Sequence, residues 1–415
     1  MRQPDRQQVI PAMALEDLIE TDHQARVVWD FCTGLDLQPL YESIRSREGG
    51  PGRAAIDPRL CVALWLYATL EGVGSARALA WLCGHHHAFR WLCGGVSVNH
   101  HTLSDFRVGH VEVLDRLLTH SVAGLREQDL VDLNRVAHDG MRVRASAGAA
   151  SFHRRPTLEQ CLREAEDQVA RLKEEMDDDP SAPSRRHAAA RERAARERAE
   201  RLRQALERLP ELEARKKAGE KEKARASGTD SEATVMKMAD GGYRPAYNIE
   251  FGVETAGLVI AAVEVTTRGS DAGQITPLND QIHDRHGVYP KETLTDGGFV
   301  NLEDIEAAQA PPRGTRVYAP VPEPKDPGRD RHAPRPGDGE QVREWRARMG
   351  TEPAQVVYRR RASTVECVNA QARNRGLIRL LVRGLRRVKA VALWFAIAHN
   401  LACGMRLRAE AGLAG

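Results

Sequence analysis

The sequence lacks the features of a membrane or secreted protein. Its 415 residues contain no continuous apolar run of about twenty residues, which is the length that a membrane-spanning helix needs. The start of the chain, MRQPDRQQVIPAMALEDLIE, also lacks the apolar stretch of a secretion signal. We therefore expect no membrane partner.

The chain also lacks an even, clustered set of cysteines and a strong net charge. Its seven cysteines are scattered and lie mostly in apolar surroundings, which is typical of reduced thiols in the cytoplasm. The net charge of +3 is too small for this length to identify a partner. Hydrophobic residues make up 41% of the chain and charged residues 29%, so a folded core with a well-solvated surface is expected.

The first part of the chain, residues 1–125, has a helical pattern. DPRLCVALWLYATLEGV begins with Asp57 as an N-cap and Pro58 at the first helical position. Short helices joined by glycine turns follow, in an order that suits a helix-turn-helix-like DNA-binding domain. A helical bundle of another purpose fits the same pattern. The Cys/His-rich segment 83–101 matches no common zinc-module spacing.

The rest of the chain alternates strands and helices, which predicts an α/β fold with a mixed sheet. LNRVAHDG reads as a first strand, YNIEFGVE and LVIAAVEVT as a hairpin, KETLT as a strand that stops at Asp296, and RVYAPV as a further strand. Residues 157–227 read as a polar helical hairpin inserted after the first strand, and 341–410 as a final helical part. Loops are expected at 322–340.

Three acidic residues stand out from this pattern. Asp139 lies within the first strand and Asp296 ends a later one, where it is followed by two glycines. Glu366 is the only acidic residue between Gln355 and Lys389, a stretch with ten Arg and Lys. Each residue has both a structural and a catalytic interpretation, and composition alone does not choose between them.

The simpler interpretations are structural. Asp-Gly is a common turn dipeptide, so Asp296 could only shape a turn. Ser363-Thr-Val-Glu366 fits a capping box, in which Glu366 would satisfy backbone N–H groups at a helix start. Asp240 and Asp271 stand beside glycines and small residues, where turn roles are expected.

The catalytic interpretation is phosphodiester chemistry. Cutting or joining DNA strands is assisted by two Mg²⁺ ions about 3.5–4 Å apart, held by two or three carboxylates. Two aspartates on neighbouring strands and one glutamate on a helix over the sheet would form such a site. Surrounding arginines would neutralise phosphates.

Several segments, taken in order, resemble one family. HDGMRVRASA, MADGGYRPAYNIEFGVETAGLVIAAVEVTTRGSDAGQ, LTDGGFVNLEDIE, and YRRRASTVE followed by RLLVRGLRRVKAVALWFAIAHNL are similar to the DDE-type transposases of bacterial insertion sequences. Within these the chain resembles the insertion-sequence-five superfamily, in its insertion-sequence-1182-like group. The helical start, AIDPRLCVALWLYATLEGVGSARALAWLC, also resembles that family's N-terminal domain.

The resemblance implies a ribonuclease-H-like catalytic domain over residues 126–410, with a mixed five-stranded sheet and the 157–227 insertion. It implies that Asp139, Asp296 and Glu366 are both the catalytic and the metal-binding residues, with two Mg²⁺ ions for which Mn²⁺ can substitute. The family's Tyr-Arg-Glu-Lys signature maps onto Tyr358, Arg361, Glu366 and Arg373.

This sequence departs from the signature in three ways. Four residues separate Arg361 from Glu366, one more than usual, and Arg373 stands where Lys is usual. Asn369 stands where an aromatic residue is common. Arginine still binds phosphate, as a planar fork rather than a point charge.

The implied function is cleavage of DNA at the ends of a mobile element and strand transfer into a target. Alternatives are a domesticated nuclease and a DNA-binding protein that no longer cuts. The expected partner is double-stranded DNA, as terminal inverted repeats and as target, with a homodimer on the element ends and a location at the bacterial nucleoid. Arginines on a predicted helix face add to the expected DNA contacts, which are Tyr358, Arg361, Arg373, Arg379, Arg383, Arg386 and Arg387.

Overall fold

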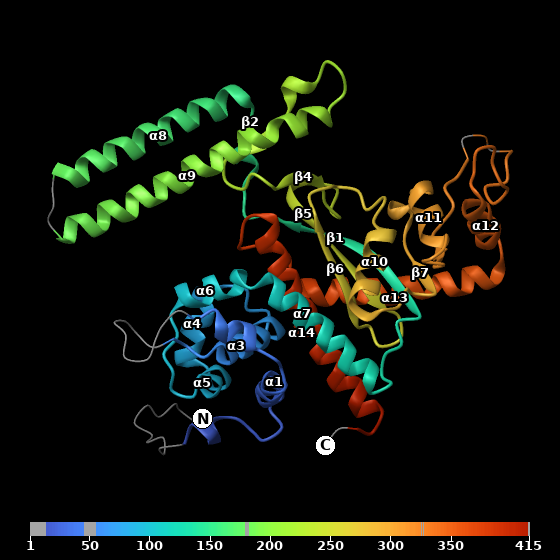
Figure 1. Ribbon diagram of the computed structural model, residues 1–415, viewed down its shortest axis with the longest axis horizontal. Coiled ribbons are helices and arrows are strands. Elements are labelled where there is room, and N and C mark those ends of the chain that lie inside the picture. The colour runs from blue at the N-terminus through green and yellow to red at the C-terminus, as the bar shows by residue number, and fades with distance from the viewer. Residues whose placement is uncertain (1–13, 45–54, 179–181, 325, 327, 414–415) are drawn as a thin grey trace, which may run out of the picture.

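The N-terminal part of the chain is helical (Figure 1). The computed structural model describes residues 14–44, 55–178, 182–324, 326 and 328–413, so the first thirteen residues of the expected N-terminal domain lie outside it. Asp57 is the N-cap of the helix that begins at Pro58 and accepts a hydrogen bond from the Arg59 N–H, as predicted. The helices are α1 (Gln24–Thr33), α2 (Gln38–Glu42), α3 (Pro58–Leu70), α4 (Ala76–His85), α5 (His87–Cys93), α6 (His100–Gly109) and α7 (Val111–Glu127).

A mixed sheet forms the centre of the second part. β5 pairs antiparallel with β1 along one edge, and with both β4 and β6 along its other edge. β1 is parallel to β7, which is parallel to β8. The order is therefore β6-β5-β1-β7-β8, and β4 pairs with the first residues of β5 along the same edge as β6. The strands are β1 (Arg135–Arg144), β4 (Thr234–Lys237), β5 (Tyr243–Glu254), β6 (Ile260–Thr266), β7 (Glu292–Leu294) and β8 (Arg316–Tyr318).

The mixed α/β class predicted from the sequence is confirmed, but the sheet has six strands rather than five. The additional strand is β4, which pairs with the first residues of β5 across a tight turn. Met238 N–H donates to the Gly242 carbonyl at 2.7 Å within that turn. The Asp-Gly-Gly segment was therefore a hairpin signal, and β5 begins at Tyr243, four residues before the expected start.

Helices cover both faces of the sheet. On one face His138 of β1 contacts Asn279 of α10 (Ile275–His286), with 2.9 Å between the ring and amide atoms. On the other face Phe251 of β5 packs against Phe395 of α14 (Leu385–Glu410), with ring centroids 5.6 Å apart. The long helix α13 (Glu352–Asn374) lies on this second face and contacts β1, β5 and β8. Successive strand residues point to opposite faces, so each face receives every second residue.

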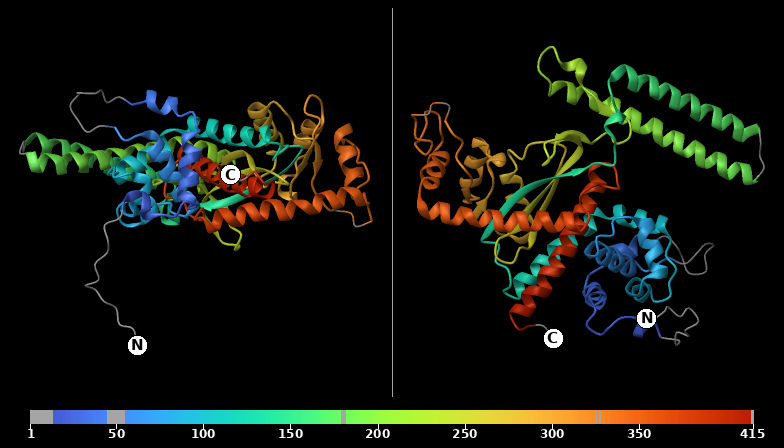
Figure 2. Two further views of the ribbon diagram at one scale, coloured as in Figure 1. Left: turned by 90° about the horizontal axis from the view of Figure 1, so that it is seen from below. Right: turned by 180° about the vertical axis from the view of Figure 1, so that it is seen from behind.

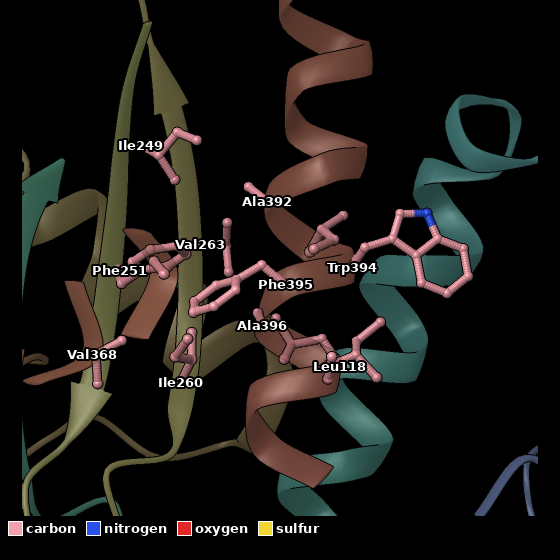
Figure 3. Close-up of a cluster of buried hydrophobic side chains, with 14 of the residues drawn as sticks. Leu118, Ile249, Phe251, Ile260, Val263, Val368, Ala392, Trp394, Phe395 and Ala396 are labelled. Carbon is pink, nitrogen blue, oxygen red and sulfur yellow. The ribbon is translucent and has the colours of Figure 1, made fainter. Parts of the chain in front are cut away.

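Helix α14 joins the helical part to the sheet. Figure 3 shows Phe395 and Ala396 directed at β5 and β6, while Trp394 faces α7. The Trp394 indole N–H donates to the Arg107 carbonyl of α6 at 2.9 Å. By length and composition α14 could cross a membrane, but 83% of its most apolar window is buried in this fold. The apolar sequence of α14 thus fits a core helix with protein on several sides.

A helical hairpin projects from the sheet (Figures 1 and 2). It consists of α8 (Arg155–Asp178) and α9 (Ala182–Ala214), and the connecting residues 179–181 lie outside the described chain. The short strands β2 (Phe152–His153) and β3 (Ala226–Ser227) pair at its base. The hairpin has its own small core, separate from the main one: Leu158, Ala165, Ala199, Leu202, Ala205, Leu209, Ala224 and Ala226.

The remaining helices connect the strands at the far edge of the sheet. α11 (Leu302–Gln309) follows β7, and Asn301 caps it by accepting a hydrogen bond from the Asp304 N–H. α12 (Glu340–Met349) follows β8 after an irregular segment, and α13 begins three residues later. These positions agree with the predicted helix after Asn301 and the predicted loop before residue 341.

We expect the sheet to fold without the hairpin, because the two hydrophobic cores share no residue. Replacing residues 154–225 with a short Gly-Ser linker keeps the β2–β3 pair that closes the base. Urea unfolding followed by tryptophan fluorescence should remain a single cooperative transition, since Trp65, Trp345 and Trp394 all lie in the main core. A broad, non-cooperative transition would show that the hairpin is part of the sheet's folding unit.

Candidate active site

The parallel pairing of β1 and β7 brings two predicted site residues together. Ala137 of β1 is in register with Leu294, the last residue of β7. Two residues further along each segment are Asp139 and Asp296, so both lie at the point where β7 ends. The Asp296 carboxylate accepts a hydrogen bond from the Gly298 N–H at 2.8 Å and starts a short turn. Asp296 is therefore a turn residue whose side chain also borders Asp139.

Two residues of α13 contact the Asp139 side chain. Asn369 donates its amide N–H to Asp139 Oδ2 at 2.8 Å, and Arg361 Nη1 lies 4.0 Å from Asp139 Oδ1. Burial raises the pKa of Asp139 to about 6; Arg361 opposes this shift, and the charges of Asp296 and Asp271 add to it. Removal from water is therefore the main reason that the charged form of Asp139 is disfavoured.

Glu366 lies on α13 but apart from the aspartates. Its side chain is 68% exposed, and its Oε1 is 4.0 Å from Nη2 of Arg361. The Arg361 guanidinium, only 15% exposed, thus stands between Asp139 and Glu366. Tyr358 is half-buried one turn before Arg361; burial raises the pKa of its hydroxyl, Arg361 opposes this shift, and Asp296 and Asp139 add to it. Three of the predicted residues, Asp139, Glu366 and Tyr358, are therefore neighbours of Arg361.

The capping-box interpretation of Glu366 is wrong. α13 begins at Glu352, where Thr351 is the N-cap and accepts from the Ala354 N–H. Ser363 and Glu366 are therefore in the middle of the helix, and the Ser363 hydroxyl donates to the Arg360 carbonyl. The Thr-Glu-Pro sequence at 351–353 is the true start signal, since proline is favoured in the first helical turn.

The predicted arginine stripe is not on one helix. α14 begins at Leu385, so Arg379 and Arg383 precede it. Leu380 N–H donates to the Arg144 carbonyl at 2.8 Å, which extends the chain alongside β1 and interrupts the helix. Gly384, with φ of 87°, then starts α14.

Some of the basic residues in this segment form ion pairs with acidic side chains. Arg386 forms an ion pair with Glu112 at 2.7 Å, and the half-buried Lys389 contacts Glu264 at 3.2 Å. Arg383 and Arg387 line a groove of about 620 Å³ with Arg193, Arg196 and Arg201 of α9. Arg373 is exposed in the last turn of α13. Four of the predicted DNA contacts, Arg379, Arg383, Arg386 and Arg387, thus lie away from Arg361, around the start of α14.

Sequence reasoning missed two polar neighbours of the aspartates. Asn369 was interpreted through what is usual in related sequences, although its position one helical turn after Glu366 places it on the same side of α13. Asp271 was interpreted as a turn residue, yet its side chain is buried against β1 and Asn248 donates to it at 2.5 Å. Beside it, burial raises the pKa of Glu250 to about 8, helped by the charges of Asp271 and Glu264.

The site fits a divalent cation only in part. Asp139 and Asp296 offer the hard oxygen ligands that Mg²⁺ prefers, and a cation beside them would offset the cost of the buried Asp139 charge. In the part of the chain that the structure describes, however, no three His, Cys, Asp or Glu side chains are close enough to hold a metal ion. This holds for the Cys/His-rich 83–101 segment too. Glu366 in particular is separated from Asp139 by Arg361.

Two family models match the chain. Residues 13–109 match a transposase domain (DUF772), and residues 330–403 match a transposase DDE domain. No curated protein and no solved structure matches. The two matches support a DDE-type transposase, and the second suggests a ribonuclease-H-like fold and a nuclease or transposase enzyme. The second match includes Arg361 and Glu366, whereas both aspartates lie outside the matched segments.

The raised pKa of Asp139 predicts a pH-dependent cost to stability. Because its folded pKa of about 6 exceeds the ordinary 3.8, the folded chain keeps a proton that the unfolded chain loses in this window. Stability should therefore fall as pH rises from about 4 to 6. As pH rises from 5 to 8, the free energy of unfolding of Asp139→Asn should increase relative to that of the unmodified protein by on the order of 1 kcal/mol. Both proteins are unfolded in urea with EDTA present.

Asp240→Asn is the matched control, because Arg244 lowers the pKa of Asp240 and its carboxylate is already ionised at pH 5. Its difference from the unmodified protein should be the same at both pH values. An Asp139→Asn difference that is equally independent of pH would contradict the raised pKa of Asp139.

The position of the α13 start gives a second prediction. Thr351→Ala removes the N-cap oxygen and should reduce the free energy of unfolding by about 0.5–2 kcal/mol. Ser363→Ala, at an exposed mid-helix position, should leave it unchanged or raise it by up to about 0.5 kcal/mol, because alanine has the higher helix propensity. Urea titration of the two variants tests this prediction. A larger loss of stability in Ser363→Ala than in Thr351→Ala would restore the capping-box interpretation.

Proposed function

We propose that this chain is the transposase of a bacterial insertion sequence, in the insertion-sequence-1182-like group of the insertion-sequence-five superfamily. It would cleave DNA at the element's ends and transfer the freed strands into target DNA. The observation that carries the proposal is the register of β1 and β7, which places Asp139 and Asp296 side by side beneath α13. The mixed sheet, in the order β6-β5-β1-β7-β8, fits the ribonuclease-H-like fold that the DDE match suggests, which further supports the proposal.

Asp139 and Asp296 would hold the metal, with Glu366 as the third carboxylate. Two Mg²⁺ ions, or Mn²⁺ in their place, would supply Lewis-acid activation of the attacking oxygen and stabilise the leaving oxygen. Asn369 orients Asp139 by donating to Oδ2, which leaves Oδ1 directed at Arg361. The 68% exposure of Glu366 leaves its side chain free to change rotamer toward the aspartates.

Arg361 and Tyr358 would act on the DNA backbone. The Nη1 of Arg361 is buried and has no hydrogen-bond acceptor among the described residues. A phosphate beside the aspartates would supply that acceptor and draw the guanidinium away from the carboxylates, since Arg binds phosphate as a two-pronged donor. Arg373, exposed two turns beyond Glu366 on α13, would extend the contact to a neighbouring phosphate.

The remaining arginines would bind DNA at a second place. Arg383 and Arg387 are exposed beside α9, and Arg379 precedes them in the turn before α14. Arg386 would contribute only if its ion pair with Glu112 opens. The helical N-terminal part would recognise the terminal repeats, in a homodimer on the two element ends located at the nucleoid.

The test is metal-dependent nicking of double-stranded DNA that carries the sequences flanking the gene. Asp139→Asn, Asp296→Asn and Glu366→Gln should each lower the cleavage rate by at least 100-fold in Mg²⁺, while binding of the same DNA in Ca²⁺ stays within a few-fold. Glu352→Gln is the matched control, because it removes an exposed carboxylate from the same helix. A Glu366→Gln protein that cuts as fast as Glu352→Gln would refute the role of Glu366.

A further inference from the structure

Asp271 is a buried carboxylate that the proposed triad does not use. It lies in the segment between β6 and α10 and is only 7% exposed. Its backbone carbonyl accepts from the Gln274 N–H, so the turn there is made by the main chain. The side chain points away from that turn, toward β1. Its burial therefore needs an explanation other than the turn.

Gly140 allows Asp271 to approach β1. A Cβ on Gly140 would lie 2.2 Å from Asp271 Oδ1, a distance that no real side chain tolerates. Only glycine at this position lets the carboxylate rest against the strand, one residue beyond Asp139. Because neighbouring strand residues face opposite ways, Asp271 reaches the edge of β1 from the face opposite α13.

The second oxygen of Asp271 faces the Asp296 turn. A Cβ on Gly298 would lie 3.4 Å from Asp271 Oδ2 and 3.0 Å from Asp296 Oδ1. The two carboxylate oxygens thus border one small space, and a glycine keeps that space open. β7 has ended here while β1 continues to Arg144, and in the described part of the chain the next contact along this edge of β1 is the single bridge between Arg144 and Arg379.

A neighbouring amide supplies a second observation, a buried oxygen without a donor among the described residues. Asn248 is fully buried and donates its N–H groups to Asp271 and Glu250. Its Oδ1 has no donor among the described residues, although it lies 3.0 Å from the same Gly140 position that Asp271 contacts. A buried oxygen without a donor is unfavourable unless water or an ion satisfies it.

We propose that Asp271 is a further carboxylate of the divalent-cation site, bound from the sheet face opposite Glu366. The inference rests on the proposed function, since it assumes that Asp139 and Asp296 hold a divalent metal. Asp271 reaches the aspartates from the other face, where Arg142 Nη2 lies 3.8 Å from its Oδ2, whereas Arg361 stands between Asp139 and Glu366. No three of these carboxylates are close enough to hold an ion among the described residues, so the cation would draw Asp139, Asp271 and Asp296 together, and Glu366 would join when Arg361 moves to phosphate.

A structural role through Arg142 is the competing explanation. Arg142 Nη2 lies 3.8 Å from Asp271 Oδ2, so Asp271 could serve only to neutralise that arginine. The two explanations differ for a variant that removes Arg142. Arg142→Leu should leave Mn²⁺ affinity unchanged or higher if Asp271 is a ligand, because a competing cation has been removed.

The main experiment measures Mn²⁺ binding to the full chain without DNA, by the electron paramagnetic resonance signal of the free ion. Asp271→Asn keeps a hydrogen-bond acceptor for Asn248 and should weaken Mn²⁺ binding by at least 10-fold, as Asp139→Asn and Asp296→Asn should. Glu250→Gln is the matched control, since it changes a carboxylate in the same buried cluster and should bind Mn²⁺ like the unmodified protein.

Each outcome decides one of the two proposals. Asp271→Asn with unchanged Mn²⁺ affinity, beside an Asp139→Asn that has lost it, overturns the role of Asp271 and leaves the proposed function intact. An equal loss in Glu250→Gln or Arg142→Leu would also overturn it, as a purely structural effect. An unmodified protein that does not bind Mn²⁺ refutes the metal site as a whole.

A measurement on the unmodified chain covers the case in which Asp271→Asn does not fold. Fe²⁺ in place of Mg²⁺, with ascorbate and hydrogen peroxide, generates hydroxyl radicals that cut the backbone beside the bound ion. Mass spectrometry should find cuts near residues 139, 271 and 296, all suppressed by excess Mg²⁺. Cuts near 139 and 296 without any near 271 would overturn the inference.

Discussion

The burial of α14 is the interaction on which the rest of the structure depends. Phe395 and Ala396 pack on β5 and β6, and the opposite side of the same helix packs on α7 and the other N-terminal helices (Figure 3). Complete burial of a Phe side chain stabilises a fold by roughly 2–3 kcal/mol, and α14 buries several large apolar side chains. The sheet that holds Asp139 and the helices expected to bind DNA therefore share one hydrophobic core.

The candidate site depends on this arrangement through α13. The helix lies on the face that α14 also covers, and it delivers Asn369, Arg361 and Glu366 to the end of β7. Its contacts with β1, β5 and β8 fix its position across the sheet. The polar residues of the candidate site thus lie at one end of an otherwise apolar interface, where β7 stops and β1 continues.

Much of this could be predicted from local sequence, because local signals determine strands and caps. The Asp57-Pro58 cap, the β5–β6 hairpin and the strand ending before Asp296 all follow from short patterns. The predictions failed where two matching signals competed or where a distant contact decided. Ser363 and Thr351 both have helix-start patterns, and only the first-turn proline at 353 favours Thr351. Arg379 lies outside a helix because its neighbour Leu380 bonds to β1, more than two hundred residues away in sequence.

The separate core of the α8–α9 hairpin has an evolutionary consequence. At 1.5 Å per residue, the 33 residues of α9 extend over about 50 Å, most of it beyond the sheet. Because the hairpin's apolar contacts are internal, paired insertions or losses of helical turns at its tip leave every contact of the sheet intact. Length in this arm is therefore free to drift between related chains, while the contacts between β1 and α13 have to be kept.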